Sequence, residues 1–184
     1  NMFAPLDKNR IPHKVLLDYG FEYTNLKAYN GTLSDSTVVD VPTLKHIYNT
    51  IFSSRVTSAT TGFINPNNFD SNWKNRTAGT ITVSGLYYKY NAFINDAINL
   101  GKVNFVNNQF QDKFVSGVWQ NPYQEFQAFA MAPAISKYEG LSFTVKIPST
   151  IFYSNYQSLV QSIQIDFGNG AGYVTVPFNQ NVTI

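Results

Sequence analysis

The sequence contains no cysteine, and this absence excludes disulfide bonds and every metal site built on thiolates. Charged residues are also scarce, because they make up 13% of the 184 residues, whereas globular domains usually have about 25%. The 13 Lys and Arg are scattered and leave a net charge of only +2. Since nucleic acids are usually bound by a basic stripe, we expect no nucleic-acid partner.

Long apolar runs are missing as well. No run approaches the roughly 18 residues that span a bilayer, so we expect no transmembrane segment. The first residues, Asn1-Met2-Phe3-Ala4-Pro5, also lack the charged-then-apolar pattern of a signal peptide. We expect that any export signal has already been removed.

What the chain does contain is uncharged polar and aromatic residues. Twenty-one Asn provide much of the polarity, and Asn favours turns over helices. Aromatic residues make up 16% of the chain and favour the half-buried surface of a sheet. We therefore predict a single mainly β domain over residues 1–184, an antiparallel β-sandwich-like fold with one packed amphipathic helix.

The first thirty residues are expected to form an extended lead that packs across a core made by other segments. Pro5 and Pro12 interrupt this region, and Gly20 and Asn30-Gly31 mark turns.

The amphipathic helix is predicted over about residues 41–55. Asp40 is a suitable N-cap, and Pro42 is tolerated in the first turn. Apolar side chains recur at helical spacing on one face, namely Leu44, Ile47, Tyr48, Ile51 and Phe52. We expect this face to pack against a sheet.

Strands are predicted mainly in the second half, where apolar and polar residues alternate. They lie at residues 80–90, 102–105, 125–129, 141–147, 162–167, 173–176 and 181–184. The glycine-rich segment 168–172 predicts a hairpin between two of them. Residues 56–76 are predicted to be a long surface excursion, either functional or poorly ordered.

The residues that usually carry catalysis are few. The chain has two His and three Glu, and neither a Gly-x-Ser-x-Gly elbow nor a His-Glu-x-x-His motif occurs. His46 lies off the apolar stripe of the helix and is expected to face solvent, while His13 is expected to have a local hydrogen-bonding role. We therefore expect no enzymatic activity from residues 1–184.

No cofactor is expected, and calcium has one weak candidate site. Asp166 and Asn169 could present alternate oxygen ligands to the ion. The alternative is an Asx-type turn in which Asp166 caps backbone amides. One carboxylate and one amide form a poor cage, which favours the turn.

Glycan recognition suits this composition better, since sugar rings stack on aromatic side chains while Asn, Gln and Asp bond the hydroxyl groups. Trp73, Trp119 and Tyr123 are the candidate ligand-binding residues, and the two Trp are favoured because they lie in turn-rich segments. Alternate members of Tyr87, Tyr88 and Tyr90 are further candidates. A binding platform needs exposed rings; the alternative is burial, because large aromatic residues dominate β-sandwich cores.

Two stretches resemble known proteins. Residues 3–12 with 16–20 resemble the opening of mature secreted proteins of Bacteroidota, and residues 163–173 resemble a recurring hairpin of the same large proteins. The hairpin is also similar to the Asp-Phe-Gly-Asp-Gly turn of PKD-like sandwich modules, with Asn169 in place of the second Asp.

This resemblance implies the N-terminal region of a large exported protein, often a type IX secretion cargo. Such proteins are secreted or held at the outer surface of a Gram-negative bacterium. Ser36, in Asp35-Ser36-Thr37, fits the short O-glycosylation pattern of these bacteria. The alternative for Ser36 is an ordinary polar loop.

Three functions fit these observations. The leading hypothesis is a non-catalytic surface or secreted module for adhesion, carbohydrate binding or assembly, with a glycan or envelope proteins as partners. The alternatives are an accessory N-terminal domain of a secreted hydrolase whose active site lies beyond residue 184, and a structural subunit of a bacterial surface machine. Because apolar spacing continues to Ile184, we expect a longer polypeptide with at least one further strand.

Overall fold

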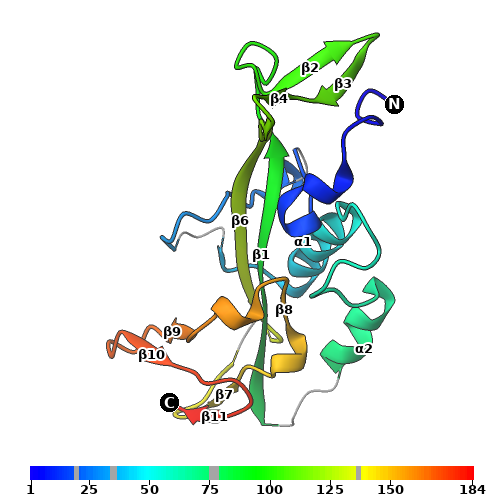
Figure 1. Cartoon of the computed structure of the whole chain (residues 1–184). Coiled ribbons are helices and arrows are strands. Elements are labelled where there is room, and N and C mark those ends of the chain that lie inside the picture. The colour runs from blue at the N-terminus through cyan, green and yellow to red at the C-terminus, as the bar shows by residue number, and fades with distance from the viewer. Residues whose placement is uncertain (19–20, 34–36, 75–78, 136–137) are drawn as a thin grey trace.

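The computed structural model describes residues 1–18, 21–33, 37–74, 79–135 and 138–184. Its centre is a long antiparallel ribbon formed by β1 (Thr80–Phe93) and β6 (Tyr123–Pro133) (Figure 1). Their register runs from Val83 opposite Pro133 to Phe93 opposite Tyr123 without interruption. The described residues contain eleven strands, so the mainly β fold predicted from the sequence is confirmed.

Short segments line the other edge of β1. β7 (Thr144–Lys146) and β8 (Phe152–Ser154) pair with β1 in parallel, one after the other, and β11 (Asn181–Thr183) pairs antiparallel with β7. Further along β1, Leu17 N donates to Asn91 O at 2.8 Å and Asn91 N donates to Val15 O at 2.9 Å. The N-terminal lead therefore extends the same sheet.

Helices cover one face of this ribbon. The amphipathic helix is present as α1 (Val41–Ser53), and the Asp40 side chain caps it by accepting from Thr43 N at 2.8 Å. Leu44, Ile47, Tyr48 and Ile51 are fully buried, while Phe52 is half-buried. They pack against side chains of the ribbon that include Leu86, Tyr88, Ala128 and Ala130. The prediction of one packed helix is thus confirmed.

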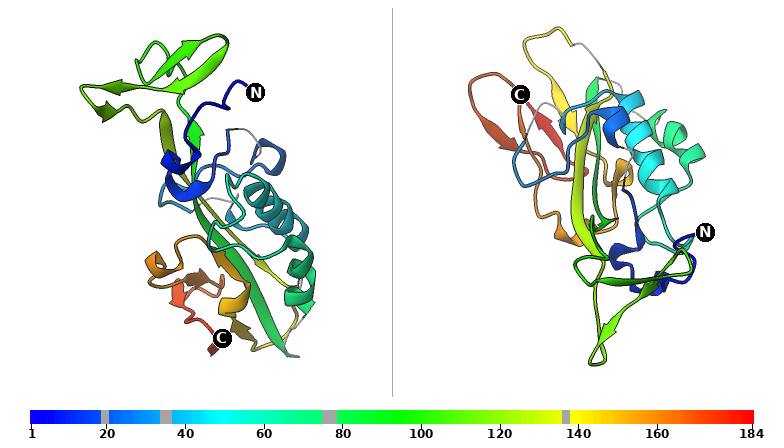
Figure 2. Two further views of the ribbon diagram at one scale, coloured as in Figure 1. Left: turned by 45° about the vertical axis from the view of Figure 1, so that its right-hand side comes forward. Right: turned by 90° about the horizontal axis from the view of Figure 1, so that it is seen from above.

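A second core lies on the opposite face of the ribbon. There the predicted hairpin is present as β9 (Gln164–Asp166) and β10 (Tyr173–Thr175), and Gly168, Gly170 and Gly172 in its turn all have positive φ angles. Val83, Val145, Phe152 and Ile163 are among the buried residues of this core. The right-hand view of Figure 2 shows the helices on one side of the ribbon and the C-terminal strands on the other.

Short 3₁₀-helices complete the body of the protein. They are η1 (Lys8–Arg10), η2 (Pro12–Lys14), η3 (Phe21–Thr24), η5 (Pro66–Asn68), η6 (Ser149–Ile151) and η7 (Gln157–Leu159). The lead contributes several of the buried side chains, namely Leu6, Ile11, Val15, Leu17, Phe21 and Leu26.

Residues 56–74 pack on the body, whereas their polar composition predicts a long surface excursion that is either functional or poorly ordered. They include a short helix, α2 (Phe69–Lys74), whose Phe69 is fully buried in the helix-side core. Phe63 stacks on Tyr88 with ring centroids 4.7 Å apart, and Tyr88 Oη donates to Gly62 O at 2.7 Å. Spaced aromatic side chains therefore anchor this segment to the body in spite of its many Thr, Ser and Asn residues.

The ribbon continues into a projection that we call the distal arm, residues 94–122. It consists of two small hairpins, β2 (Val103–Val106) with β3 (Gln109–Asp112) and β4 (Phe114–Val115) with β5 (Val118–Trp119). Both lie at the end of the molecule opposite the C-terminus (Figures 1 and 2).

Ile51→Ala should lower the free energy of unfolding by about 2–5 kcal/mol, the usual range when a large buried side chain is truncated to alanine. Ile51 is fully buried between α1 and the ribbon. Urea denaturation monitored by circular dichroism measures the change. His46→Ala is the control, because His46 is exposed on the same helix and surface changes usually stay within about 0.5 kcal/mol. Equal stability of the two variants would place α1 outside the core.

Candidate functional site

Two of the three aromatic residues predicted to bind a ligand are buried in the free protein. Trp73 is 8% exposed, because α2 turns its ring into the helix-side core beside Phe69. Tyr123 is 4% exposed at the start of β6. Of the two alternatives for these residues, burial therefore holds for both, and neither ring forms a surface platform in the free protein.

Trp119 is half-buried at the base of the distal arm. Its Nε1 donates to Asp112 Oδ1 at 2.9 Å, and the guanidinium of Arg10 lies 5.7 Å from the centroid of its ring. The polar edge of the indole and one region around its ring are thus occupied by side chains of the protein itself. This position leaves Trp119 poorly placed to stack on a sugar.

The candidate calcium residues act as turn formers. Asp166 Oδ1 accepts from Gly168 N at 2.8 Å, and Asn169 Oδ1 accepts from Ala171 N at 3.0 Å. These are the bonds of successive Asx turns. Within the described ranges, no group of three or more His, Cys, Asp or Glu side chains is arranged to hold a metal ion. The candidate glycosylation residue Ser36 lies outside the described residues.

The two histidines have different surroundings. His46 is exposed on α1, as expected. His13 Nε2 lies 2.5 Å from Glu125 Oε2, and His13 Nδ1 lies 2.7 Å from Tyr156 Oη. Glu125 also accepts from Lys89 Nζ at 2.9 Å, and these two donors hold the pKa of its carboxyl below the usual value. His13 therefore has a hydrogen-bonding role, but a long-range one, because its partners lie 112 and 143 residues away in the sequence and join the lead to the ribbon.

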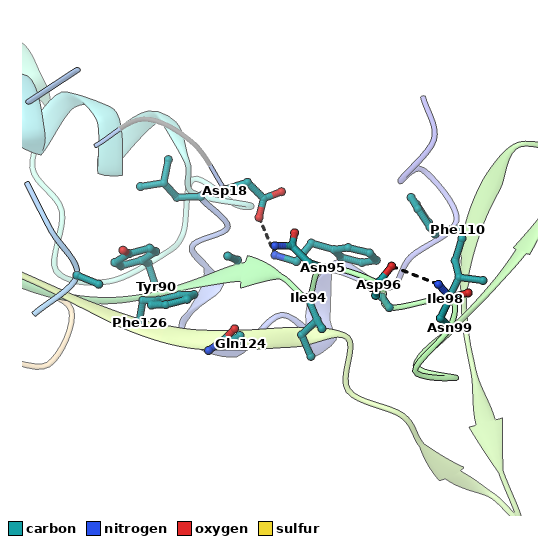
Figure 3. Close-up of a pocket in the computed structure, with 15 residues that line it drawn as sticks. Asp18, Tyr90, Ile94, Asn95, Asp96, Ile98, Asn99, Phe110, Gln124 and Phe126 are labelled. Atoms are coloured by element: carbon teal, nitrogen blue, oxygen red, sulfur yellow. Dashed lines mark hydrogen bonds between the residues drawn. The ribbon is translucent and has the colours of Figure 1, made fainter. Parts of the chain in front are cut away.

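A pocket of about 720 Å³ lies where the ribbon meets the distal arm. Figure 3 shows its walls. One comes from the lead through Leu17 and Asp18, and another from the end of the ribbon through Tyr90 and Phe126. The turn after β1, residues 94–99, closes a third side. This volume lies within the range that is typical of small-molecule sites.

Aromatic rings form the floor of this pocket. The rings of Tyr90 and Phe126 are cross-strand neighbours, stacked with centroids 5.7 Å apart and planes inclined by 24°. Phe93 and Phe110 add a second pair, with centroids 5.0 Å apart. Tyr90 is one of the alternate tyrosines that the sequence suggested, but it is 6% exposed and also packs on Phe21, so it supports the floor from below. The accessible aromatic surface comes from the half-buried Phe93, Phe110 and Phe126.

Polar groups stand around these rings. Asp18 Oδ1 accepts from Phe93 N at 2.7 Å, which fixes the lead against the end of β1, and Asp96 Oδ1 accepts from Asn99 Nδ2 at 3.2 Å (Figure 3). The side chains of Asn95 and Gln124 make no hydrogen bond with any described residue and line the pocket. Their amides can therefore both donate to and accept from a ligand.

Charge in the pocket is of one sign. Asp18 and Asp96 are its only charged lining residues, and no Lys, Arg or His is among the described residues of its walls. An anionic ligand would meet two carboxylates and no counter-charge. The pocket is therefore suited to a neutral or cationic ligand that has both apolar faces and hydrogen-bonding groups.

Sequence reasoning missed most of these residues. The signal available was the polar cluster Asn95-Asp96 with Asn99 directly after the longest alternating segment. This cluster could not be recognised as part of a pocket from the sequence, because the opposite wall comes from the lead. Asp18, which forms that wall, is 75 residues away from Phe93, to which it is hydrogen-bonded.

Comparison of the chain with models of protein families, with curated proteins and with solved structures gives no match. No helix in the described part of the chain is long and apolar enough to cross a membrane.

Stability should fall in alkaline solution because of buried tyrosines. Burial raises the pKa of Tyr123 to about 12, and the nearby carboxylates of Asp112 and Asp7 add to this effect. Burial raises the pKa of Tyr153 to about 12 as well. An unfolded tyrosine ionises near pH 10, so both residues contribute stability that is complete below about pH 10 and is lost as the pH rises towards about 12.

The urea midpoint should therefore fall over this pH window, and phenolate absorbance should show delayed ionisation of these tyrosines in the folded state. Tyr123→Phe should reduce the pH dependence without lowering stability at pH 7, because the Tyr123 hydroxyl has no hydrogen-bond partner among the described residues. A midpoint that stays constant up to pH 12 would contradict the burial of these phenols.

Proposed function

We propose that the protein is a non-catalytic binding module, located outside a bacterial cell, that takes a neutral glycan in the pocket between the ribbon and the distal arm. One observation carries this proposal: half-buried phenylalanine rings and amide side chains without a hydrogen-bond partner among the described residues line the same concave surface. Sugars present apolar C–H faces beside rings of hydroxyl groups, and this pocket offers a partner for each.

The hydroxyl groups of a sugar need partners that can both donate and accept. Asn95 and Gln124 have this property, and both are exposed. Phe126, half-buried and stacked on the buried Tyr90, supplies aromatic surface next to them. The two carboxylates, Asp18 and Asp96, can accept further bonds from hydroxyl groups, and the absence of a basic lining residue in the described walls favours uncharged over sulfated or acidic sugars.

The same carboxylates support a binding role rather than hydrolysis. A glycosidase needs one carboxyl group that stays protonated near neutral pH, which enzymes achieve by burial or by a close second carboxylate. Asp18 and Asp96 are both exposed. Each also accepts a hydrogen bond that shapes the pocket, from Phe93 N and from Asn99 Nδ2 respectively.

The location outside the cell is supported by composition. A chain with no cysteine, 13% charged residues and abundant Asn is typical of exported bacterial β domains, and the resemblance to secreted proteins of Bacteroidota agrees with this. Fractionation of the source organism, with an antibody against the domain, tests the location directly. Detection only in the cytoplasmic fraction would contradict it.

A glycan array probed with the purified protein should give signals for neutral oligosaccharides and none for sulfated ones. For the strongest glycan, Asn95→Ala with Gln124→Ala should weaken binding by roughly 5- to 150-fold, because each lost hydrogen bond contributes about 0.5–1.5 kcal/mol. Isothermal titration calorimetry measures the affinities. The matched control is Asn104→Ala, an exposed Asn on β2 outside the pocket. An array without signal, or equal weakening by the control, would reject the pocket as a glycan site.

A further inference from the structure

The distal arm has an unusual distribution of apolar side chains. Both of its hairpins have tight two-residue turns, Asn107-Asn108 and Ser116-Gly117, in which all four residues have positive φ angles, as type I′ turns require. Valines flank these turns directly. Val106 is 46% exposed and Val118 is 64% exposed. The outermost points of the arm are therefore apolar and convex.

Other apolar side chains extend this surface. Phe105, Phe114 and Val115 are each between 42% and 50% exposed. Each hairpin is a two-stranded sheet that pairs with no other described strand, so these side chains have no sheet to cover them. Isolated exposed apolar residues are ordinary, but a group of them at one projecting end indicates a surface that meets another phase or another molecule.

Charge is confined to the base of the arm. Between residues 97 and 123 the charged residues are Lys102, Asp112 and Lys113, and each lies at the end of its hairpin away from the turn. Arg10, from the lead, joins them there, with its guanidinium 5.0 Å from the centroid of the Phe114 ring. Trp119 and its bond to Asp112 lie at the same level. Arg10 is paired there with Asp7 at 3.4 Å and with Asp112 at 4.0 Å, whereas no ion pair of Lys102 or Lys113 is seen among the described residues. The arm thus has uncharged apolar tips and a base that holds an indole, the Arg10 ion pairs and two lysines.

We propose that the distal arm inserts its two hairpin tips into the interfacial region of a phospholipid surface. This arrangement suits a membrane interface, in which apolar groups meet the acyl chains while amphipathic rings and cations lie at the headgroups. Trp119 would be the ring, and Lys102 and Lys113 would be the cations that face phosphate. A protein partner would need a separate concave receptor for each convex tip, whereas a fluid lipid surface adapts to both. The insertion is shallow and involves hairpin tips only.

Vesicle co-sedimentation of the whole protein tests the proposal. The vesicles consist of phosphatidylcholine, with or without phosphatidylglycerol, and contain no glycolipid, so the result is independent of the glycan pocket. The protein should sediment with both, and more with the anionic vesicles. Val106→Asp with Val118→Asp should reduce the partition coefficient by more than about tenfold, because charged side chains enter the apolar layer at high cost.

The matched control is Leu141→Asp with Leu159→Asp, which places two carboxylates at exposed positions of the body outside the arm. It should sediment like the unmodified protein. Retention of the unmodified protein in the supernatant with both vesicles would overturn the proposal, as would equal sedimentation of the arm variant. Reversible dimerisation without lipid that the arm substitutions abolish would assign the surface to a second copy of this chain instead.

A second measurement leaves the sequence of the arm unchanged, so its result does not depend on whether the Val106→Asp, Val118→Asp variant folds. In Trp73→Phe, Trp119 is the sole tryptophan. Vesicles with brominated acyl chains should quench its emission, because Trp119 belongs to β5, directly after the Val118 tip that inserts. Emission that brominated and unbrominated vesicles affect equally would also overturn the proposal.

Discussion

The hydrogen bonding of one strand edge determines how this chain is assembled. β1 is fourteen residues long, and one of its edges is paired with β6. The backbone N–H and C=O groups along its other edge also need hydrogen-bond partners, because unpaired buried groups are costly. Short segments provide them in turn: β7, β8 and the lead at Val15–Leu17. Between the part of β1 that pairs with β8 and the part that pairs with the lead, the Asn155 side chain takes the place of a strand. Its Oδ1 accepts from Lys89 N and its Nδ2 donates to Lys89 O. Regions from both ends of the sequence are thereby fixed along one strand, and this places Asp18 against the end of β1, where it becomes a wall of the pocket.

The sequence predicts those parts of the fold whose side chains repeat with a regular period. The helix at residues 41–55, the long strand and the C-terminal hairpin all have such patterns, and all are present. β8 is different, because Phe152, Tyr153 and Ser154 are all buried and therefore show no alternation. β4 and β5 have two residues each, too few for any period. The parallel pairing of β7 and β8 with β1 depends on contacts between distant segments, which local patterns do not encode.

The residues of the candidate site also could not be predicted from local patterns alone. Whether an aromatic ring is exposed for binding or buried in the core depends on which other segments pack over it. Trp73 lies in a polar stretch, yet Phe69 four residues earlier places both rings on one side of α2 and hence in the core. Phe126 lies in the alternating strand β6, yet it is only half-buried and lines a pocket whose other walls come from the lead and from the turn after β1. Composition indicated the chemistry of aromatic rings with amides, and tertiary structure determined which residues provide it.

The pocket and the distal arm depend on the same turn. Residues 94–102 are held by a compact set of backbone bonds, including Leu100 N to Asp96 O at 2.9 Å and Lys102 N to Ala97 O at 2.8 Å. This turn presents Asn95 to the pocket and starts the arm at β2. A change in its backbone would therefore move both surfaces together, and loss of both functions in such a variant would not distinguish them. Side-chain changes at Gln124 and at Val118 leave the turn intact, and for this reason they can assign glycan binding and lipid contact to separate parts of the molecule.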